Sequence, residues 1–235
     1  MSAVKVFLIT GTSKGIGHFL ANYYLADNNI VFGCSRGISS ISHPNYIHFQ
    51  MNVTDESACK DFFREIRKRT GRLDVLINNA GIASMNHFVL TPVDTINKVL
   101  QTNILGPYIF SREAAKLMKK EGGGDIINFS TVAVPLRLKG EAIYASSKAA
   151  IVNLTQIMSK ELADWGIRVN AVGPTPIYTD LIKAVPKEKI DELISQQAIK
   201  RLGEFTDVVN VIDFFINPKS SFITGQVIYL GGVHQ

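Results

Sequence analysis

Short apolar segments alternate along the chain with longer stretches in which apolar residues recur every three or four positions. The longer stretches are helical patterns, such as the one that carries Ala58, Phe62 and Ile66, one from about Pro92 to Lys120, and one from Ala142 to Asp164. The short segments are typical of buried β-strands and occur at Val4–Ile9, Ile30–Cys34, Tyr46–Gln50, Leu73–Asn78, Asp125–Ser130, Ile167–Val172 and Gln226–Leu230. The alternation predicts βαβ units, and therefore a single α/β domain over residues 1–235 with a doubly wound parallel sheet.

A glycine-rich turn follows the first predicted strand. From Thr10 to Gly17 it reads Thr-Gly-Thr-Ser-Lys-Gly-Ile-Gly, and a helical pattern begins directly after it at Phe19. Such a turn lets the backbone approach a pyrophosphate, and the following helix N-terminus offers unpaired N–H groups and a positive dipole end. The spacing differs from the usual Gly-x-Gly-x-x-Gly fingerprint. A plain turn also uses glycine, so the strand before it and the helix after it carry the prediction of a nucleotide site.

Tyr144 and Lys148 lie four residues apart at the start of the helical pattern 142–164. At that spacing the two side chains share one face of a helix. A phenol has a resting pKa of about 10, and a nearby ammonium favours the phenolate and lowers that pKa. The pair therefore predicts a general acid or base. Such pairs are also common on ordinary helix surfaces, and the nucleotide site elsewhere in the chain favours the catalytic interpretation.

Other candidate residues fall at the carboxyl ends of predicted strands, where ligands bind in an open parallel sheet. The glycine turn follows the first strand, Arg36 ends the second, and the segment Asn78–Gly81 follows the fourth. Ser130 and Thr131 end the fifth strand, and Pro174 follows the sixth. Positions far apart in the sequence thus converge on one edge of the sheet, which predicts a single binding site.

These motifs, in this order, resemble the classical short-chain dehydrogenase/reductase family, and its 3-oxoacyl-acyl-carrier-protein reductases in particular. The resemblance covers nearly the whole chain and rests on the glycine turn, the pair of Tyr144 and Lys148, and the segments Asn78-Asn79-Ala80-Gly81, Asn103-Ile104-Leu105-Gly106, Ile223-Thr224-Gly225-Gln226 and Gly231-Gly232. It implies a Rossmann fold, a nicotinamide cofactor, Tyr144 and Lys148 as the catalytic pair, and Asn103 as a structural and proton-relay residue.

The end of the second predicted strand bears on the choice of cofactor. An acidic residue there would accept the ribose hydroxyls of NAD, whereas this chain has Ser35 and Arg36. Arg36 can bind a 2′-phosphate through charge-assisted hydrogen bonds, and Lys14 adds a second cation. We therefore expect NADP(H) to be preferred over NAD(H). The family resemblance implies cofactor contacts at Gly11, Ser13, Lys14, Gly15, Ile16, Gly17, Ser35, Arg36, Asn52, Val53, Asn79, Ala80, Gly81, Tyr144, Lys148, Pro174, Ile177 and Thr179.

The resemblance places the catalytic hydroxyl thirteen residues before the tyrosine, at Thr131, where the family has serine. The adjacent Ser130 points the other way if both lie on a strand, but a shift of one residue would present Ser130 instead. The implied reaction is reduction of a carbonyl with NADPH. One of these hydroxyls and Tyr144 hold the carbonyl oxygen, and Tyr144 donates the proton. Lys148 lowers the pKa of Tyr144 and holds the nicotinamide ribose, and Asn103 connects Lys148 to solvent through water.

Two rival interpretations remain. One is the same fold making or modifying sugars or polyketides, where only the flap differs. The other is a non-enzymatic NADPH-binding or interaction protein on the same fold, with Thr131 marking a degraded site. The intact Tyr144, Lys148 and Asn103 favour the enzyme. Residues 176–202 are expected to form a mobile flap over the site, although their apolar residues equally suit plain core packing. These residues are Tyr178, Leu181, Ile182, Val185, Ile190, Leu193 and Ile194.

The expected substrate is an apolar ketone or a β-ketoacyl thioester, either free or linked to a carrier protein. Basic residues could meet an acidic acyl carrier protein, but a solvated helix face is the simpler explanation for them. They are Arg112, Lys116, Lys119, Lys120 and the segment Arg67–Arg69.

Composition argues against several other classes of protein. The 235 residues carry a net charge of +5, which forms no nucleic-acid-binding stripe. No apolar stretch reaches the roughly 18 residues of a membrane span, and the N-terminus lacks the layout of a signal peptide. The two cysteines form no disulfide framework, and the five histidines show no metal-ligand spacing. We therefore expect a cytoplasmic protein without a metal and without a membrane or nucleic-acid partner.

The two long helical patterns carry more apolar residues than one inner face needs, and surplus apolar faces usually mark interfaces. The surplus includes Ile109, Phe110, Leu117, Leu154 and Ile157. Because the family pairs these helices across a two-fold axis, the resemblance implies a homo-oligomer, and a tetramer in particular.

Overall fold

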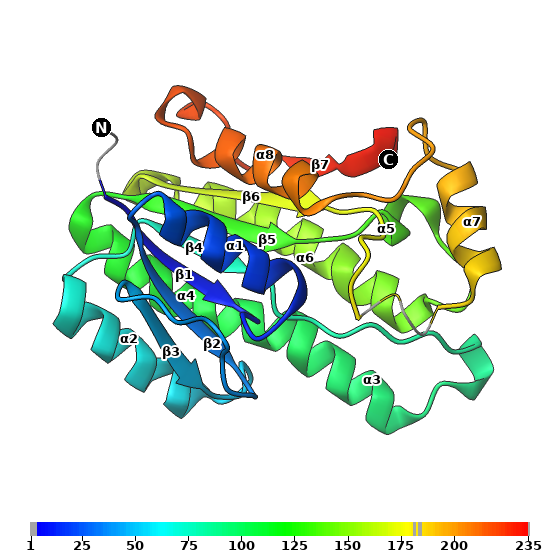
Figure 1. Ribbon diagram of the computed structural model, residues 1–235, viewed down its shortest axis with the longest axis horizontal. Helices are drawn as coiled ribbons and strands as arrows, with labels where there is room; N and C mark the ends of the chain where they lie inside the picture. The colour runs from blue at the N-terminus through cyan, green and yellow to red at the C-terminus, as the bar shows by residue number, and fades with distance from the viewer. Residues whose placement is uncertain (1–3, 181, 183–184, 235) are drawn as a thin grey trace.

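A seven-stranded parallel sheet forms the centre of the molecule, in the order β3-β2-β1-β4-β5-β6-β7 (Figure 1). The computed structural model describes residues 4–180, 182 and 185–234. The chain winds outward from β1 to β3 and then from β4 to β7, which confirms the predicted doubly wound α/β sheet. The strands are β1 Val6–Thr10, β2 Ile30–Ser35, β3 Tyr46–Gln50, β4 Val75–Asn78, β5 Gly124–Phe129, β6 Ile167–Gly173 and β7 Val227–Tyr229.

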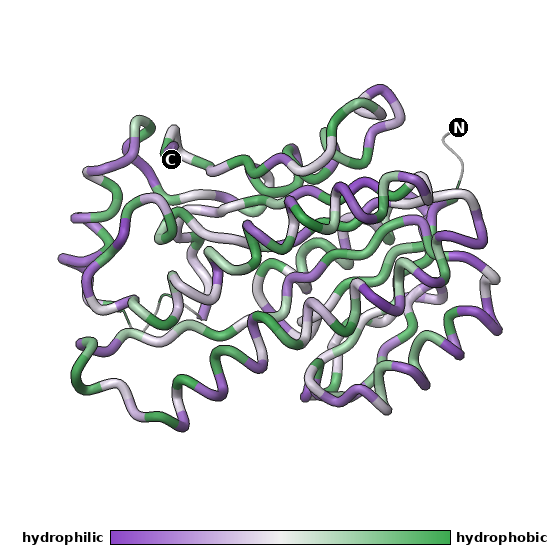
Figure 2. Tube along the Cα trace, turned by 180° about the vertical axis from the view of Figure 1, so that it is seen from behind, coloured by the Kyte–Doolittle hydropathy of each residue, from purple (hydrophilic) through white to green (hydrophobic). Residues whose placement is uncertain are grey.

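Helices cover both faces of the sheet, so the strands are buried on both sides and read as continuous apolar runs (Figure 2). One face packs against α1 (Gly15–Ala26) and α8 (Phe205–Ile216). The other face packs against α2 (Glu56–Thr70), α4 (Gly106–Met118) and α6 (Ala142–Glu161). Three shorter helices lie beyond the carboxyl edge of the sheet (Figure 1), namely α3 (Val93–Leu100), α5 (Ala133–Leu136) and α7 (Lys187–Ser195).

The helix expected from Pro92 to Lys120 is not a single α-helix. A π-helical turn, Gln101–Leu105, joins α3 to α4, and a 3-10 turn, Lys119–Glu121, follows α4. Pro107 has no N–H group, so it cannot close the ordinary α-helical bond to the carbonyl of Asn103. The wider Gly106 N–H to Gln101 carbonyl bond forms instead. Single π turns are frequent at functional sites, and this one carries the fully buried Asn103.

The apolar residues assigned to a subunit interface from the sequence are mostly part of the core. Ile109, Phe110 and Leu117 pack inside the single chain and are at most 4% exposed, so they are not surplus. Leu154 packs against the same core, and only Ile157 of the five is exposed. The sequence pattern overestimated the number of apolar residues left for an interface, because α4 is covered by the sheet on one side and by α2 on another. A homo-oligomer stays a prediction, which light scattering checks.

One ion pair joins the neighbouring strands β5 and β6, where Asp125 and Arg168 lie opposite each other. The Arg168 guanidinium lies 2.7 Å from Asp125 Oδ1 and also donates to the Ser220 carbonyl at 2.6 Å. Both charged side chains are largely buried, at 16% and 13% exposure. Removing one partner of such a pair leaves an uncompensated charge. We expect Arg168→Ala to lower the free energy of unfolding by roughly 2–4 kcal/mol, measured by denaturant titration at pH 8.

The exposed pair of Arg69 and Glu65 on α2 provides the control, because removing it by Arg69→Ala should cost under about 1 kcal/mol. Burial raises the pKa of Asp125 to about 6 despite Arg168. A raised carboxyl pKa means that the folded state binds the proton more tightly, so stability from this group is lost as pH rises through 6. The decrease in the free energy of unfolding caused by Arg168→Ala should therefore be smaller at about pH 5 than at pH 8. An equal decrease at both pH values would contradict this account.

The remaining expectations about composition concern membranes, metals and thiols. Within the described residues, no helix is long and apolar enough to cross a membrane. The same residues hold no group of three or more His, Cys, Asp or Glu side chains placed to bind a metal ion. Cys34 and Cys59 are free and buried, and burial raises the pKa of both thiols. Such buried thiols are poor nucleophiles.

Candidate active site

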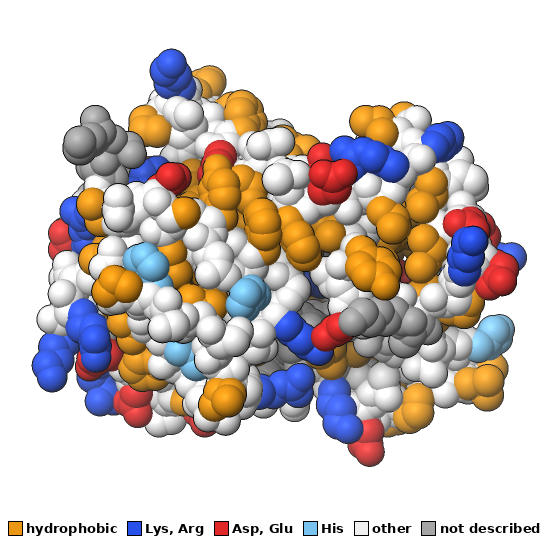
Figure 3. Space-filling view, in the orientation of Figure 1, with side chains coloured by type: hydrophobic (Ala, Val, Ile, Leu, Met, Phe, Trp, Pro, Cys, Tyr) orange, Lys and Arg blue, Asp and Glu red, His pale blue; other side chains and the backbone are white. Residues whose placement is uncertain are grey.

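A cavity of about 930 Å³ runs along the carboxyl edge of the sheet, from Arg36 past the glycine turn to Tyr144 and the inner side of α7. In Figure 3 the surface is hollowed between the body of the sheet and the lobe that carries α7. All the site residues expected from the sequence line this cavity except Gly17 and Asn103. The strand ends therefore meet in one space, which is large enough for a drug-sized or larger ligand.

The glycine turn leaves a backbone surface that suits an anion. Gly11 and Gly15 have left-handed φ values of +78° and +62°, which favour glycine. The first turn of α1 has no acidic side chain, and Lys14 at its N-cap makes no capping hydrogen bond. Its N–H groups are thus available to a pyrophosphate. Gly17 contributes by packing, since a side chain there would collide with the Gly11 carbonyl and the Asn79 amide.

Asn79 holds the glycine turn against the end of β4. Its amide nitrogen donates to the carbonyls of Thr10 and Gly11, at 2.8 and 3.3 Å. The Ala80 N–H donates to the Thr10 hydroxyl at 3.0 Å. Asn79, which was expected to bind the cofactor, therefore also holds the glycine turn in shape. The sequence interpretation did not identify Thr10 as a hydrogen-bond partner of Asn79 and Ala80.

The two cations expected to contact a 2′-phosphate stand at the open end of the cavity. Lys14 makes an exposed ion pair with Asp180, at 3.1 Å. Arg36 is exposed, and among the described residues no carboxylate lies within ion-pair distance of its guanidinium. The neighbouring Ser35 hydroxyl donates to the Gly37 carbonyl at 2.8 Å. An incoming anion would thus find Arg36 available, whereas Lys14 must first exchange or share its partner.

The Thr131 side chain, rather than that of Ser130, lies beside Tyr144. Its hydroxyl accepts the Ala133 N–H at 3.3 Å and lies close enough to the Tyr144 phenol to lower the pKa of that phenol. The Ser130 hydroxyl donates instead to the Lys148 carbonyl at 3.5 Å. β5 ends at Phe129, so the two hydroxyls lie just beyond the strand and not at its end as expected. They still point in different directions, as strand alternation would predict.

The protonation states differ from those expected. Burial raises the pKa of Tyr144 to about 12, its hydrogen bond with Thr131 lowers it, and the charge of Glu141 raises it. The Lys148 ammonium donates to the Phe129 carbonyl at 2.8 Å. Burial also lowers the pKa of Lys148 itself to about 8. Desolvation is the largest influence on both groups, and the lowering of the phenol pKa by Lys148 stays a prediction.

Asn103 is fully buried and makes three side-chain hydrogen bonds. Its Oδ1 accepts the Ile82 N–H at 2.9 Å, and its Nδ2 donates to the Ile82 carbonyl at 2.9 Å and to the Ser147 hydroxyl at 3.0 Å. Ser147 in turn donates to the Tyr144 carbonyl at 2.7 Å. Gly81 leaves room for both groups, since a Cβ there would lie 3.3 Å from Asn103 Oδ1 and 3.4 Å from Lys148 Nζ. The sequence interpretation did not identify Ser147, because a serine directly before a lysine forms no recognisable motif.

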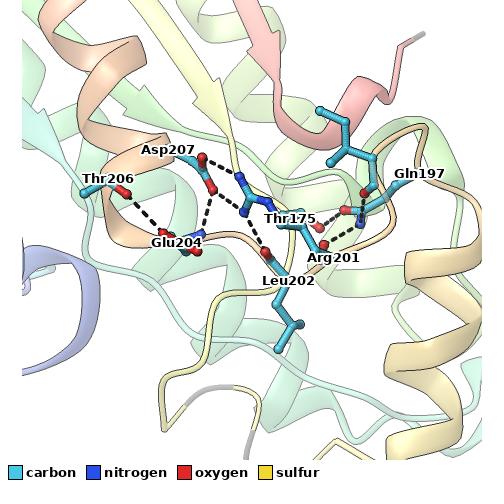
Figure 4. Close-up of polar contacts among 8 residues, drawn as sticks. Thr175, Gln197, Arg201, Leu202, Glu204, Thr206 and Asp207 are labelled. Atoms are coloured by element: carbon cyan, nitrogen blue, oxygen red, sulfur yellow. Dashed lines mark hydrogen bonds and ion pairs between the residues drawn. The ribbon is translucent and has the colours of Figure 1, made fainter.

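A polar network holds the two ends of the segment 176–202 (Figure 4). Thr175 hydrogen-bonds the Gln197 side-chain oxygen, and Gln197 Nε2 donates to the Arg201 carbonyl at 2.9 Å. Arg201 binds both carboxylate oxygens of Asp207, at 2.7 and 2.8 Å. The segment thus leaves and rejoins the body at fixed points, and its expected mobility stays a prediction.

The apolar residues expected on the flap divide between several environments. Ile182, Val185, Ile190 and Leu193 line the cavity, and Leu193 is also buried against Val132. Both earlier interpretations, substrate contact and core packing, therefore apply to Leu193. Tyr178 is 72% exposed, Ile194 is partly exposed, and Leu181 lies outside the described residues.

The fold and the cavity together define a Rossmann-type oxidoreductase. A family model described as Enoyl-(Acyl carrier protein) reductase matches residues 21–234. The chain belongs to the short-chain dehydrogenase/reductase family.

Individual relatives span the same length. The chain is 32% identical over 248 residues to the 3-oxoacyl-[acyl-carrier-protein] reductase FabG of Staphylococcus aureus, covering 99% of this chain and 98% of that protein. Among solved structures, ElxO with NADP bound has a TM-score of 0.89 and 35% identity, with 98% of each chain covered. A 4-hydroxyisoleucine dehydrogenase complexed with NADH has a TM-score of 0.84 and 28% identity, with 97% of each chain covered. The two structures carry different cofactors, so the shared fold does not decide between NADP(H) and NAD(H).

Proposed function

We propose that this protein reduces a carbonyl group to an alcohol with NADPH. The observation that carries the proposal is that Thr131, Tyr144 and Lys148 line one cavity wall with Thr131 beside the Tyr144 phenol, while Asn103 and Lys148 both approach Gly81. A bound reduced nicotinamide supplies the hydride for such a reaction. The name of the FabG relative, a 3-oxoacyl-[acyl-carrier-protein] reductase, supports a β-ketoacyl type of substrate.

The residues have distinct roles in this proposal. Thr131 and Tyr144 donate hydrogen bonds to the substrate oxygen as negative charge develops on it. With its pKa raised to about 12, Tyr144 is protonated at neutral pH and able to donate its proton. Lys148 holds the nicotinamide ribose, and its lowered pKa of about 8 makes it a source for reprotonation. Asn103 holds the start of α6 through Ser147 and, as the family resemblance implies, connects Lys148 to solvent through water.

A dinucleotide would be held along the length of the cavity. The glycine turn and the start of α1 would take the pyrophosphate, Asn52 and Val53 the adenine, and Arg36 and Lys14 the 2′-phosphate. Nearer the reacting end, the contacts would come from Asn79, Ala80, Gly81, Pro174, Ile177 and Thr179, all of which line the cavity. Gly15 has no side chain to block a pyrophosphate, and the first turn of α1 has neither an acidic side chain nor a side-chain cap. Both features fit this assignment.

A carrier protein is a less supported partner. Several cations proposed to meet it already have intramolecular partners, which favours the helix-surface explanation. Arg112 pairs with Glu56 at 2.7 Å, Lys116 with Glu113 at 2.8 Å, and Lys119 lies 4.0 Å from the Trp165 ring centre. A free carbonyl compound therefore remains the working substrate.

The direct test is turnover. The protein would be incubated with NADPH and a panel of ketones that includes a β-ketoacyl thioester, while nicotinamide absorbance is followed and the alcohol is identified. We expect at least one carbonyl to be reduced. Tight NADPH binding with no turnover of any carbonyl would contradict the proposal and favour a binding protein.

NADPH is expected to bind more tightly than NADH, and Arg36→Ala should remove most of the difference. Arg36 is free to meet the 2′-phosphate, whereas Lys14 is paired with Asp180, so Lys14→Ala should have the smaller effect. The two contacts together are worth about 1–3 kcal/mol, or roughly 5- to 150-fold in dissociation constant. Fluorescence titration at low and high salt measures both constants.

Two further variants sharpen this test. Asp180→Asn releases Lys14 from its ion pair and should therefore tighten NADPH binding more than NADH binding. Lys68→Ala removes an exposed cation on α2, away from the cavity, and should leave the ratio unchanged. Equal affinities of the natural protein for the two cofactors would disprove the assignment.

A further inference from the structure

Glu141 places a carboxyl group in the wall of the active-site cavity, and among the described residues one of its oxygens has no hydrogen-bond partner. It lines the cavity three residues before Tyr144 and occupies the N-cap position of α6. Its side chain makes no capping hydrogen bond to the helix. Its Oε2 atom is buried and finds no hydrogen-bond partner among the described residues. Buried polar groups are nearly always hydrogen-bonded in native proteins, so this exception requires an explanation.

The charged groups around the cavity do not supply the partner. Burial alone raises the pKa of Glu141, and no cation lowers it. The Lys148 ammonium is engaged by the Phe129 carbonyl. Lys189 pairs with Glu192 at 2.9 Å, and Lys139 also acts on Glu192. Within the part of the chain that the structure describes, Glu141 therefore has an unused acceptor.

Many side chains near Glu141 in the cavity lining are apolar, namely Met85, Val132, Leu138, Ile182, Val185 and Leu193, although Lys139, Lys189 and Glu192 also line the cavity. A plain alkyl ketone would fill this space and leave the carboxyl desolvated without a donor, which is costly. Glu141 lies one helical turn before Tyr144, so the two side chains can reach one small ligand. Their closeness is also evident because the Glu141 charge raises the pKa of Tyr144. A donor near the carbonyl group would meet both residues at once.

Building on the proposed carbonyl reduction, we propose that Glu141 is a specificity-determining residue that accepts a hydrogen bond from a hydroxyl or ammonium group of the substrate. The protein then selects carbonyl compounds that carry such a donor one or two carbons from the carbonyl carbon. This narrows the substrate class, because an unsubstituted alkyl ketone offers Glu141 nothing. Glu141 takes no part in proton or hydride transfer in this scheme.

Two ketones of equal size test the assignment, 4-hydroxy-2-butanone and 2-pentanone. The natural protein should prefer the hydroxy ketone by about 10- to 100-fold in kcat/KM. Glu141→Met removes the acceptor at similar length and should bring the ratio near one through loss on the hydroxy ketone. Glu141→Gln keeps an acceptor oxygen and should retain the hydroxyl preference while losing any preference for protonated 4-amino-2-butanone. Glu188→Met, an exposed carboxylate outside the cavity, is the matched control.

Binding of the same two ketones to the protein loaded with oxidised NADP, which has no hydride to give, provides a readout without turnover. Ligand-observed NMR should show tighter binding of the hydroxy ketone, and this difference should vanish in Glu141→Met. Such a binding difference supports the role of Glu141 even if neither ketone is reduced. A lack of reduction would count only against the proposed carbonyl reduction. Equal binding of the two ketones, or a ratio unchanged in both Glu141 variants, overturns the inference even if reduction proceeds.

Discussion

Tyr144→Phe is expected to lower kcat for ketone reduction by about 10²–10⁴-fold, the range for loss of a positioned general acid. The substitution removes only the phenol oxygen, which is the group that donates a proton to the substrate oxygen in the proposed reaction. Burial keeps the pKa of this phenol near 12, so the donor is protonated at any pH used for the assay. The cofactor end of the cavity is untouched, and the dissociation constant for NADPH should hardly change. Single-turnover and steady-state assays with the same ketone measure the two quantities.

Tyr108→Phe serves as the control for this substitution. Tyr108 is 51% exposed on α4, and losing its phenol oxygen should leave kcat unchanged. A Tyr144→Phe protein that keeps the full rate would show that the proton comes from another group. The proposed roles of Lys148 and Asn103 would then have to be reassigned as well, since both act through Tyr144.

Thr131→Val is expected to lower kcat by about 10²–10³-fold, the typical cost of losing one donor to a developing oxyanion. Valine has nearly the shape of threonine and lacks the hydroxyl, so NADPH binding should be kept. Thr131→Ser should stay active, because it retains the hydroxyl and only removes a methyl group from the pocket. The contact between the Thr131 hydroxyl and Tyr144 is the physical basis of this expectation.

Ser130→Ala distinguishes the two neighbouring hydroxyls. Ser130 donates to the Lys148 carbonyl, so its loss should have a much smaller effect on kcat than Thr131→Val. The reverse order, with Ser130→Ala inactive and Thr131→Val active, would mean that the substrate oxygen is held one residue earlier. If neither substitution matters while Tyr144→Phe does, a different donor holds the oxygen.

The sequence by itself determined the architecture, because buried parallel strands must be continuously apolar and their amphipathic helices must repeat every three to four residues. It also determined which segments reach the carboxyl edge, since each candidate residue follows directly after a strand. Strand alternation and the spacing to Tyr144 favoured Thr131 over Ser130, and which hydroxyl is active stays a prediction. These features are local or periodic, and a sequence displays local and periodic features directly.

Only the tertiary structure decided the features that depend on what surrounds a side chain. The pattern on α4 could not tell that Ile109 and Phe110 face the core of the single chain, because burial depends on the partner helix and the sheet. The spacing of Tyr144 and Lys148 suggested an acidified phenol, but desolvation outweighs that effect once both are buried. The Lys14–Asp180 pair joins residues that are distant in the chain, and the lack of a partner for Glu141 Oε2 among the described residues depends on distant segments around it. Electrostatics and hydrogen bonding act through space, so their balance is settled only when the chain has folded.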